Sequence, residues 1–206
     1  MTASKVMVRK SSLPKDFPDF FLWMGEVEKF LAKLQKDHPK GEIFDLVITS
    51  PPYNIGKEYE KRLTREEYLV WQRAVIEAII PFVKKDGAVC WQVGSHVERN
   101  VLTPLDVHFI PIFEELGLKL RNRIVWHFGH GLHETRRLSG RYETLLWYTK
   151  SDKYTFNLDK IRIPQLYPGK KAYKGPNKGT LSGNPRGKNP TDVLNIPNVK
   201  GVLLHI

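Results

Sequence analysis

The chain has 206 residues, of which 33 are lysine or arginine and 22 are aspartate or glutamate, so its formal net charge is +11. Hydrophobic residues make up 41% of it, which is enough for a buried core and excludes a chain that is disordered throughout. The single cysteine excludes an internal disulfide framework and a metal site built from several cysteines. It also favours a reducing compartment.

The N-terminal segment from Met1 to Lys10 has no apolar core of the kind found in secretory signal peptides. The apolar stretches elsewhere are well short of the roughly 20 residues that span a bilayer. We therefore expect a cytoplasmic protein without a membrane partner.

Positive charge is concentrated in the second part of the chain. Residues 1–118 hold 16 Lys and Arg against 17 Asp and Glu, a net charge of −1, whereas residues 119–206 hold 17 against 5, a net charge of +12. A uniformly solvated surface would not sort its charges in this way, so the second part predicts a surface that binds a polyanion, with nucleic acid as the leading partner. The alternative is a basic tail that only keeps the chain soluble.

Short apolar runs alternate with amphipathic helical patterns over the first 150 residues. Runs rich in β-branched and aromatic residues predict strands, and apolar side chains spaced by three or four residues predict helices. Thr64 and Glu67, for example, have the spacing of a helix capping box. We expect strands at residues 20–24, 44–49, 88–94, 118–126 and 142–149, and helices at residues 27–37, 64–82 and 111–116.

This order of elements predicts an α/β fold. Helices between successive strands imply a parallel sheet that is covered on both faces. The last two strands have no helix between them, so we expect them to pair antiparallel.

The composition changes beyond residue 160. The 27 residues from Pro164 to Pro190 hold five prolines, five glycines, six lysines or arginines and no acidic residue. Such a segment does not form a packed core, and a flexible linker is one interpretation. Its cations are interleaved with Tyr167 and Tyr173, as in loops that bind nucleic acid, which favours contact with DNA. These cations are Lys170, Lys171, Lys174, Lys178, Arg186 and Lys188.

The residues Ser50-Pro51-Pro52-Tyr53 directly follow the apolar strand at 44–49. Open α/β sheets bind ligands at the carboxyl ends of their strands, so this turn is a candidate site. The two prolines fix an extended backbone, and Ser50 and Tyr53 are held at the mouth of the sheet. We expect the turn to receive a flat ring that bears an amine; the alternative is a rigid turn followed by an aromatic plug.

The segment from Asp45 to Asn54 resembles the motif of the DNA amino-methyltransferases, which read Asp, Asn or Ser before Pro-Pro-Tyr after an apolar strand. These enzymes transfer a methyl group from S-adenosylmethionine to the exocyclic amine of cytosine or adenine. Further blocks occur in the order of the circularly permuted beta class, with Tyr142 where the family usually has His. They are Leu22 to Glu26, Gly87 to Gly94, Arg121 to Trp126 and Arg141 to Lys150.

The resemblance covers residues 19–160 and implies a Rossmann-like methyltransferase fold that is incomplete and has a basic Gly/Pro-rich recognition region. On this basis we expect residues 1–160 to form the catalytic part of a methyltransferase domain. Residues 161–206 would form a basic target-recognition loop region, with truncation of that region left open.

The resemblance also implies roles for the residues of the turn. A target base flipped out of the duplex would stack on Tyr53, while the Ser50 hydroxyl and the Pro51 carbonyl accept hydrogen bonds from its amine and Pro52 rigidifies the turn. Methyl transfer would then be direct, without a covalent enzyme intermediate. Ser at the first motif position is more typical of N4-cytosine than of N6-adenine enzymes. The implied contacts of S-adenosylmethionine are Glu26, Ser50 and Asn54.

Further DNA contacts are expected outside the basic segment. Lys57 and Arg62 lie in the loop after the turn, where we expect contact with phosphate near the flipped base, and Arg136 and Arg137 lie in a Gly- and His-containing loop that is another candidate for DNA contact. Each of these charges is also open to the simpler interpretation that it is an ordinary solvated side chain.

Two other features have structural interpretations. His127, His130 and His133 are spaced by three, but no carboxylate pattern supports metal binding, so we interpret them as part of a polar loop and expect no metal. Carbon-5 methylation of cytosine needs a nucleophilic thiol, and Cys90 lies inside a predicted strand, where a core role is expected.

Enzymes of this class also need a Gly-rich turn, resembling Asp-Pro-Phe-x-Gly-x-Gly, for the methionine part of the cofactor, and residues 1–206 contain none. One hypothesis is a DNA methyltransferase of restriction-modification, or its catalytic half, acting on double-stranded DNA with the Gly-rich lobe supplied by a second polypeptide or with a homodimer as the working form. The alternative is a non-catalytic DNA-binding remnant or regulatory subunit that does not bind cofactor.

Overall fold

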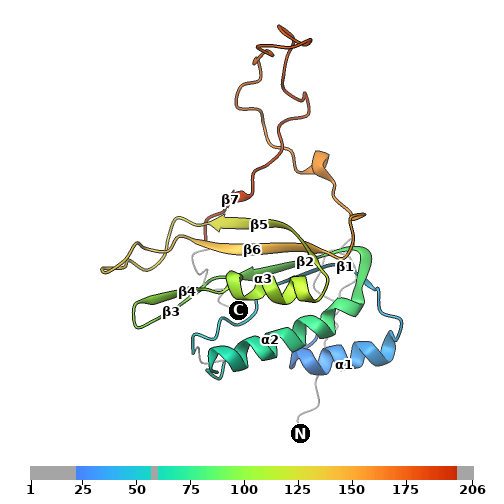
Figure 1. Ribbon diagram of the computed structural model, residues 1–206, viewed down its shortest axis with the longest axis vertical. Helices are drawn as coiled ribbons and strands as arrows, with labels where there is room; N and C mark the ends of the chain where they lie inside the picture. The colour runs from blue at the N-terminus through green and yellow to red at the C-terminus, as the bar shows by residue number, and fades with distance from the viewer. Residues whose placement is uncertain (1–21, 57–59, 199–206) are drawn as a thin grey trace, which may run out of the picture.

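Figure 1 shows a computed structural model of the chain, in which residues 22–56 and 60–198 are described. Helices and strands alternate along much of the chain, and five of the strands form one sheet, which confirms the α/β fold class. The elements are α1 (Val27–Asp37), β1 (Phe44–Thr49), α2 (Arg65–Ile79), the 3-10 turn η1 (Ile80–Phe82), β2 (Val83–Val93), β3 (Ser95–Glu98), β4 (Val101–Pro104), α3 (Asp106–Glu115), β5 (Lys119–His127), β6 (Tyr142–Thr149), the 3-10 turn η2 (Leu158–Lys160) and β7 (Val193–Asn195).

The larger sheet has the strand order β1-β2-β6-β5-β7. β1 and β2 are parallel, as their connection through α2 requires, and β5 and β6 are antiparallel, as predicted. β6 inserts between β2 and β5 and is antiparallel to both, so the expectation of a parallel sheet holds only for the pairs β1–β2 and β5–β7. β3 and β4 form a separate two-stranded hairpin.

Aromatic side chains form the core between the sheet and the helices. Trp91 of β2 contacts the rings of Phe109 and Phe113 on α3, with ring centroids 6.0 and 5.6 Å apart. Phe113 in turn stacks on Tyr148 of β6 at a centroid distance of 4.4 Å. Stacked and edge-to-face pairs of this kind add to the stabilisation from burial, so these contacts fix α3 on the sheet.

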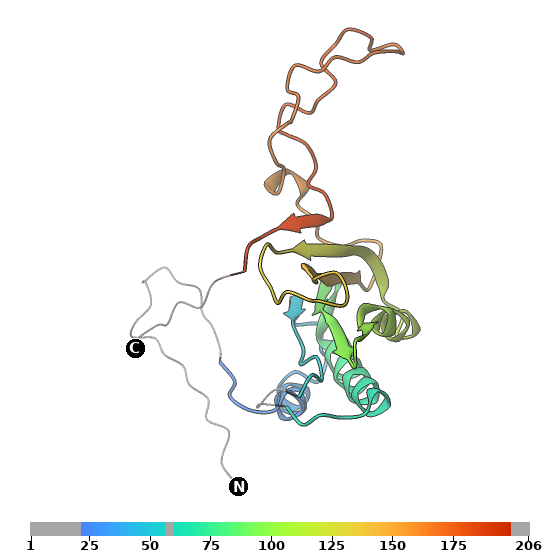
Figure 2. The same ribbon diagram turned by 90° about the vertical axis from the view of Figure 1, so that its left-hand side faces the viewer.

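The prediction that the sheet is covered on both faces is wrong for the described residues. Leu46 and Ile48 of β1 point away from the core and are 53% and 67% exposed, and no described helix lies over them. Both connections, β1 to β2 and β2 to β5, step in the same direction across the sheet between parallel strands. Because such connections are right-handed, α2 and α3 lie on the same face (Figures 1 and 2).

The largest differences between predicted and observed boundaries concern three elements. Residues 20 and 21 of the first predicted strand lie outside the described residues; of the rest, Leu22 forms an isolated β-bridge and residues 23 and 24 belong to no strand. β2 starts at Val83 rather than at residue 88. α3 begins at Asp106 although Pro111 lies inside it, because burial of Phe109 and Phe113 outweighs the one backbone hydrogen bond that a proline removes.

Residues 161–192, called the arm below, project from the sheet and return to it at β7 (Figures 1 and 2). The legs of the arm are joined by backbone hydrogen bonds between Ile163 and Lys188, at 3.1 and 2.9 Å, and by the bond from Ala172 N to Thr180 O at 2.8 Å. The two sides of the arm are therefore held together by backbone hydrogen bonds. The chain after the arm returns to the sheet, since β7 pairs with β5. The predicted division of the chain into two parts after residue 160 stays a prediction.

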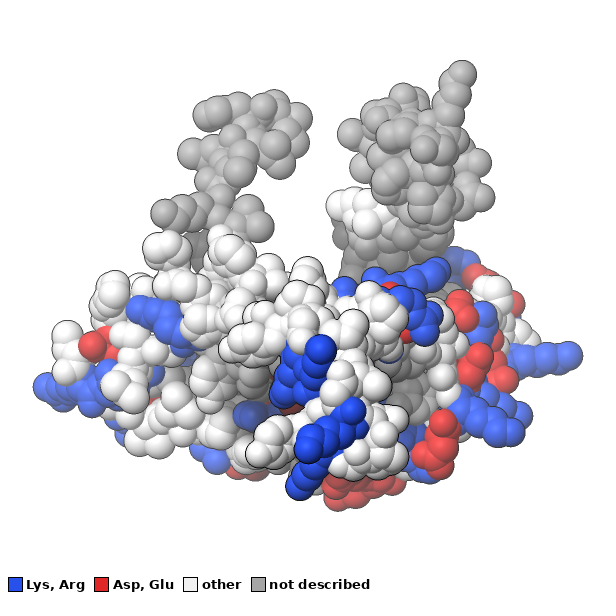
Figure 3. All heavy atoms as spheres, turned by 90° about the horizontal axis from the view of Figure 1, so that it is seen from above, with Lys and Arg blue, Asp and Glu red and all other residues white. Residues whose placement is uncertain are grey.

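The arm exposes its side chains. Tyr167 and Tyr173 are 73% and 90% exposed. Figure 3, which views the molecule from above and thus along the arm, shows blue Lys and Arg side chains separated by uncharged surface at its centre, with most red side chains towards one side. Within the part of the chain that the structure describes, no helix is long and apolar enough to cross a bilayer.

Candidate active site

The Ser50–Tyr53 turn directly follows Thr49, the last residue of β1, and is held by a hydrogen bond from α2. The hydroxyl of Tyr68, a residue of α2 that is 2% exposed, donates a hydrogen bond of 2.7 Å to the carbonyl oxygen of Pro52. A rigid dipeptide of prolines is thus anchored to a buried helix side chain, which gives the turn a single backbone geometry.

Tyr53 is held by a carboxylate from a distant strand. Its Oη donates to Oε2 of Glu143 on β6 at 3.0 Å, and Gln92 of β2 donates through Nε2 to the same oxygen at 2.6 Å. Oγ of Ser50 lies 3.2 Å from Tyr53 Oη. Because the one hydrogen of the Tyr53 hydroxyl goes to Glu143, the Ser50 hydroxyl donates to Tyr53 and keeps its own lone pairs free to accept.

Gly94, directly after β2, makes room for the Tyr53 ring. A Cβ atom at this position would lie 3.0 Å from Cε2 of Tyr53 and 3.4 Å from Oε1 of Glu143. Any larger residue would therefore displace the ring or the carboxylate that holds it.

Protonation states follow from burial. Burial raises the pKa of Tyr53 well above its ordinary value, and the Glu143 carboxylate raises it further. Tyr53 is therefore a neutral phenol that can stack and donate a hydrogen bond but cannot act as a base. Burial also raises the pKa of the Cys90 thiol to about 11, so this thiol stays protonated at neutral pH. The expected core role of Cys90 is wrong, because the residue is only partly buried and its neighbours Val89 and Trp91 are the β2 side chains that enter the core.

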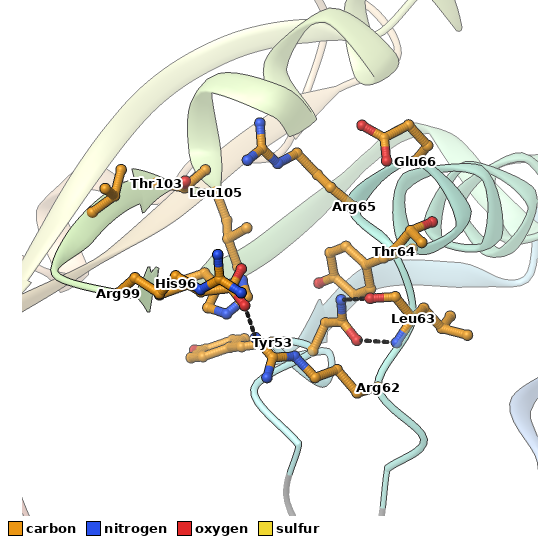
Figure 4. Close-up of a pocket in the computed structure, with 14 residues that line it drawn as sticks. Tyr53, Arg62, Leu63, Thr64, Arg65, Glu66, His96, Arg99, Thr103 and Leu105 are labelled. Carbon is orange, nitrogen blue, oxygen red and sulfur yellow. Dashed lines mark hydrogen bonds and ion pairs between the residues drawn. The ribbon is translucent and has the colours of Figure 1, made fainter.

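A cavity of about 710 Å³ opens beside Tyr53, between the turn, the start of α2 and the β3–β4 hairpin (Figure 4). Tyr53 and the buried Leu105 contribute apolar surface, whereas the cations come from Arg62 and Arg65, before and at the start of α2, and from Arg99 on the hairpin. Its size is in the range of small-molecule pockets, about 300–1,000 Å³.

The side chain of Asn54 links the turn to the loop that leads to α2. Its Nδ2 donates to the carbonyl oxygen of Leu63 and its Oδ1 accepts from the Leu63 amide, both at 2.8 Å. The residue is 6% exposed and has a φ of 57°, and Glu60 accepts hydrogen bonds from the amides of Asn54 and Ile55. Both polar atoms of the Asn54 side chain are thus bonded to the backbone of Leu63. The predicted contact of Asn54 with the cofactor stays a prediction.

The other predicted site residues are spread over the molecule. Glu26 is the N-cap residue of α1, and its carboxylate lies 2.8 Å from Lys29 Nζ. Arg136 and Arg137 lie in the β5–β6 loop, where Arg137 pairs with Glu134 at 2.6 Å. Lys57 lies outside the described residues. The six predicted DNA contacts of the basic segment all lie on the arm, where Arg186 pairs with Asp159 and the backbone of Lys188 bonds Ile163.

Three residues at the turn escaped the sequence analysis as site residues: Gln92, Gly94 and Glu143. They come from the carboxyl end of β2 and the start of β6, next to the end of β1 in the sheet. One signal pointed to Glu143, since it lies in the block from Arg141 to Lys150. Gln92 and Gly94 likewise lie in the block from Gly87 to Gly94, but nothing local marks them as partners of Tyr53, because that contact depends on the pairing of strands far apart in the sequence.

Comparison with known proteins relates this geometry to a family. The family model of N6/N4 DNA methylases matches residues 44–204. The type II methyltransferase M.BglII of Bacillus subtilis is 47% identical over 192 residues, which are 91% of this chain and 52% of that protein. M.ScaI of Streptomyces caespitosus is 36% identical over 183 residues, 88% of this chain and 57% of that protein. The chain thus spans about half the length of these relatives.

Solved structures agree on the fold. The PvuII DNA methyltransferase (cytosine-N4-specific) matches 78% of this chain and 53% of its own, with a TM-score of 0.57 and 19% identity. M1.HpyAVI in its SAM complex matches 86% of this chain and 64% of its own, with a TM-score of 0.50 and 15% identity. The Rossmann-like methyltransferase fold expected from the sequence is thereby confirmed. Given a family model that matches most of the sequence, and the Ser-Pro-Pro-Tyr turn at the end of β1, the chain belongs to the N6/N4 DNA methylase family.

Proposed function

We propose that this chain supplies the catalytic turn and the DNA-recognition region of a restriction-modification methyltransferase. The substrate would be the exocyclic amine of a cytosine or adenine flipped out of double-stranded DNA, and the methyl donor S-adenosylmethionine. The observation that carries the proposal is the Tyr53 ring, fixed by Glu143 and Gly94 beside the cavity.

The turn has the groups that an aromatic amine requires. The lone pair of such an amine is delocalised into the ring, so the nitrogen is a poor nucleophile until its hydrogens are accepted by fixed oxygens. The free lone pairs of Ser50 Oγ and the carbonyl of Pro51 are the proposed acceptors, and Tyr53 is the proposed stacking surface. The rate enhancement would come from positioning and electrostatics, because the neutral Tyr53 supplies no base. Ser50 favours N4-cytosine as the target.

The fit to the donor is partial. Glu26 and Ser50 are the proposed contacts of its adenosine end, but the Gly-rich turn for its methionine end is not among residues 1–206. When bound, S-adenosylmethionine supplies a methyl group on a sulfonium. We propose that a part outside residues 1–206 provides the Gly-rich turn. Calorimetry of the chain with S-adenosylmethionine should then show weak or undetectable binding, and micromolar binding would contradict the proposal.

DNA would be held by the arm and the β5–β6 loop. The exposed lysines of the arm and its two exposed tyrosines offer cations for phosphates and rings for bases. Arg136 in the β5–β6 loop and Lys57 after the turn are proposed as additional contacts.

The decisive test is substitution of Tyr53 in the protein supplied with the cofactor-binding part. Tyr53→Ala should abolish methyl transfer to plasmid DNA while weakening DNA binding only modestly, and Tyr53→Phe, which keeps the ring, should retain part of the activity. Preserved turnover in Tyr53→Ala would remove the stacking role. The alternative, a DNA-binding subunit without activity, predicts no methyl transfer even with the complementing part.

A further inference from the structure

We infer that the cavity beside Tyr53 binds the target nucleotide through its phosphate as well as its base, with Arg65 and Arg99 as the phosphate ligands. This inference rests on the proposed function and adds a binding site for a phosphodiester oxyanion. It differs from the contacts expected on the arm, which would hold the flanking duplex.

The cavity has two chemically different sides. Tyr53, together with Tyr68 and Leu105, which are both 2% exposed, provides aromatic and apolar surface on the inside. Arg65 and Arg99 are exposed residues that line the cavity, one from the start of α2 and the other from the β3–β4 hairpin (Figure 4). A ligand with a flat ring at one end and an anion at the other matches this arrangement, and a nucleotide is such a ligand.

Arg65 and Arg99 differ from the third arginine of the cavity. Arg62 is neutralised by an ion pair with Glu98 at 2.8 Å. No ion pair of Arg65 or Arg99 occurs within residues 22–56 and 60–198, although Glu66 also lines the cavity. Two guanidinium groups without an ion-pair partner among the described residues therefore belong to the lining of one cavity, and guanidinium is the side-chain group best suited to bidentate contact with phosphate.

The backbone of Arg99 gives an independent observation. Arg99 and Asn100 form the two-residue turn between β3 and β4, with φ angles of 48° and 66°, and Glu98 pairs with Val101 across it. Turns with two left-handed residues favour Asn and Gly, so an arginine at the first position is not what the backbone selects. Side chains kept at such a position against local preference are typical of functional sites. Here the arginine reaches the cavity.

Two oxyanions could satisfy these cations, a DNA phosphodiester and the carboxylate of the methyl donor. The solvent-exposed rim favours the phosphodiester, because a nucleotide that swings in from a duplex keeps its backbone at the entrance while its base goes to the inside. The carboxylate is the competing outcome of the test.

The test measures duplex DNA binding by fluorescence anisotropy as a function of salt in the full chain. Each lost phosphate contact lowers the slope of log K against log salt by roughly 1. We expect that decrease for Arg65→Gln and for Arg99→Asn, and none for Lys33→Gln, which removes one charge on α1 from an ion pair with Asp37. Arg99→Asn should melt at or above the wild-type temperature, since Asn suits the turn, so its weaker binding would not reflect unfolding.

The arm variant Lys170→Gln/Lys171→Gln distinguishes a failure of the phosphate site in the cavity from a failure of the proposed DNA binding. If it lowers the slope while both arginine variants keep the wild-type slope, the inference is overturned and the proposed DNA binding stands. If the wild-type chain does not bind duplex DNA, the proposed function fails.

The source of the anion is settled by NMR of the arginine Nε–H groups. Titration with deoxycytidine monophosphate should shift the signals of Arg65 and Arg99, whereas deoxycytidine, which has the base without the phosphate, should leave them in place. Shifts with methionine or S-adenosylmethionine and none with the nucleotide would assign the cavity to the donor's carboxylate and overturn the inference.

Discussion

The hydroxyl of Tyr53 donates a hydrogen bond of 3.0 Å to the carboxylate of Glu143, a residue 90 positions later in the chain. This contact joins the turn after β1 to the start of β6, and Gln92 of β2 bonds the same carboxylate oxygen. Three strands thus fix one aromatic ring, and the ring orientation depends on the register of the sheet.

Removal of the Glu143 carboxylate should impair methyl transfer more than DNA binding. Glu143→Ala leaves Tyr53 Oη and Gln92 Nε2 without their acceptor, so the ring loses its fixed position and kcat should fall on the order of a hundredfold. Glu143→Gln keeps one acceptor oxygen and should be intermediate. The kinetics are to be measured with the cofactor-binding part present, and an unchanged kcat in Glu143→Ala would show that the contact does not position Tyr53.

Gly94→Ala should reduce methyl transfer without unfolding the protein. The added Cβ would lie 3.0 Å from Cε2 of Tyr53, so the ring must shift by a few tenths of an ångström, while the melting temperature should change by only a few degrees. Gly140→Ala is the matched control, because nothing lies within 4 Å of a Cβ there, and the DNA affinity of both variants is measured as well because Gly140 lies in the β5–β6 loop. Equal activity of the two variants would contradict the close fit of the ring.

The arm should provide much of the salt-dependent part of DNA binding. Replacing Lys170, Lys171 and Lys174 by Gln removes up to three phosphate contacts and should lower the slope of log K against log salt by about 3. The fold should be intact by circular dichroism, since the arm contributes nothing to the aromatic core. A wild-type slope in this triple variant would instead favour the interpretation of the segment as a flexible linker.

Stability should depend on pH above 9 because of Cys90. Its pKa is raised by burial from 9.0 to about 11 in the folded state, so the unfolded state releases the proton first. Stability is therefore fully present below pH 9 and is lost as the pH rises from 9 to 11, by at most about 1.4 kcal/mol per pH unit. Cys90→Ala removes this loss.

Urea unfolding at several pH values, wild type against Cys90→Ala, measures the difference. The buried tyrosines, whose pKa values burial also raises, contribute equally to both proteins above pH 10. Parallel pH curves for the two proteins would show that the thiol of Cys90 is not shielded as the structure places it.

The sequence was sufficient for features set by neighbouring residues. The capping box of Thr64 and Glu67 forms at the start of α2, because it depends on residues three apart. The Ser50–Tyr53 turn is found at the carboxyl end of β1, since two prolines end a strand wherever it lies in the fold. The concentration of positive charge beyond residue 118 is likewise a property of the sequence alone.

Only the tertiary structure decided which residues meet at the turn. Glu143 and Gly94 reach Tyr53 because β6 inserts beside β2 in one particular register, and a shift by one residue would turn Glu143 to the other face of the sheet. The exposed face of β1 and the arginines around the cavity also depend on how α2, α3 and the β3–β4 hairpin pack. Such contacts join segments tens of residues apart, and local sequence patterns carry no information about that distance.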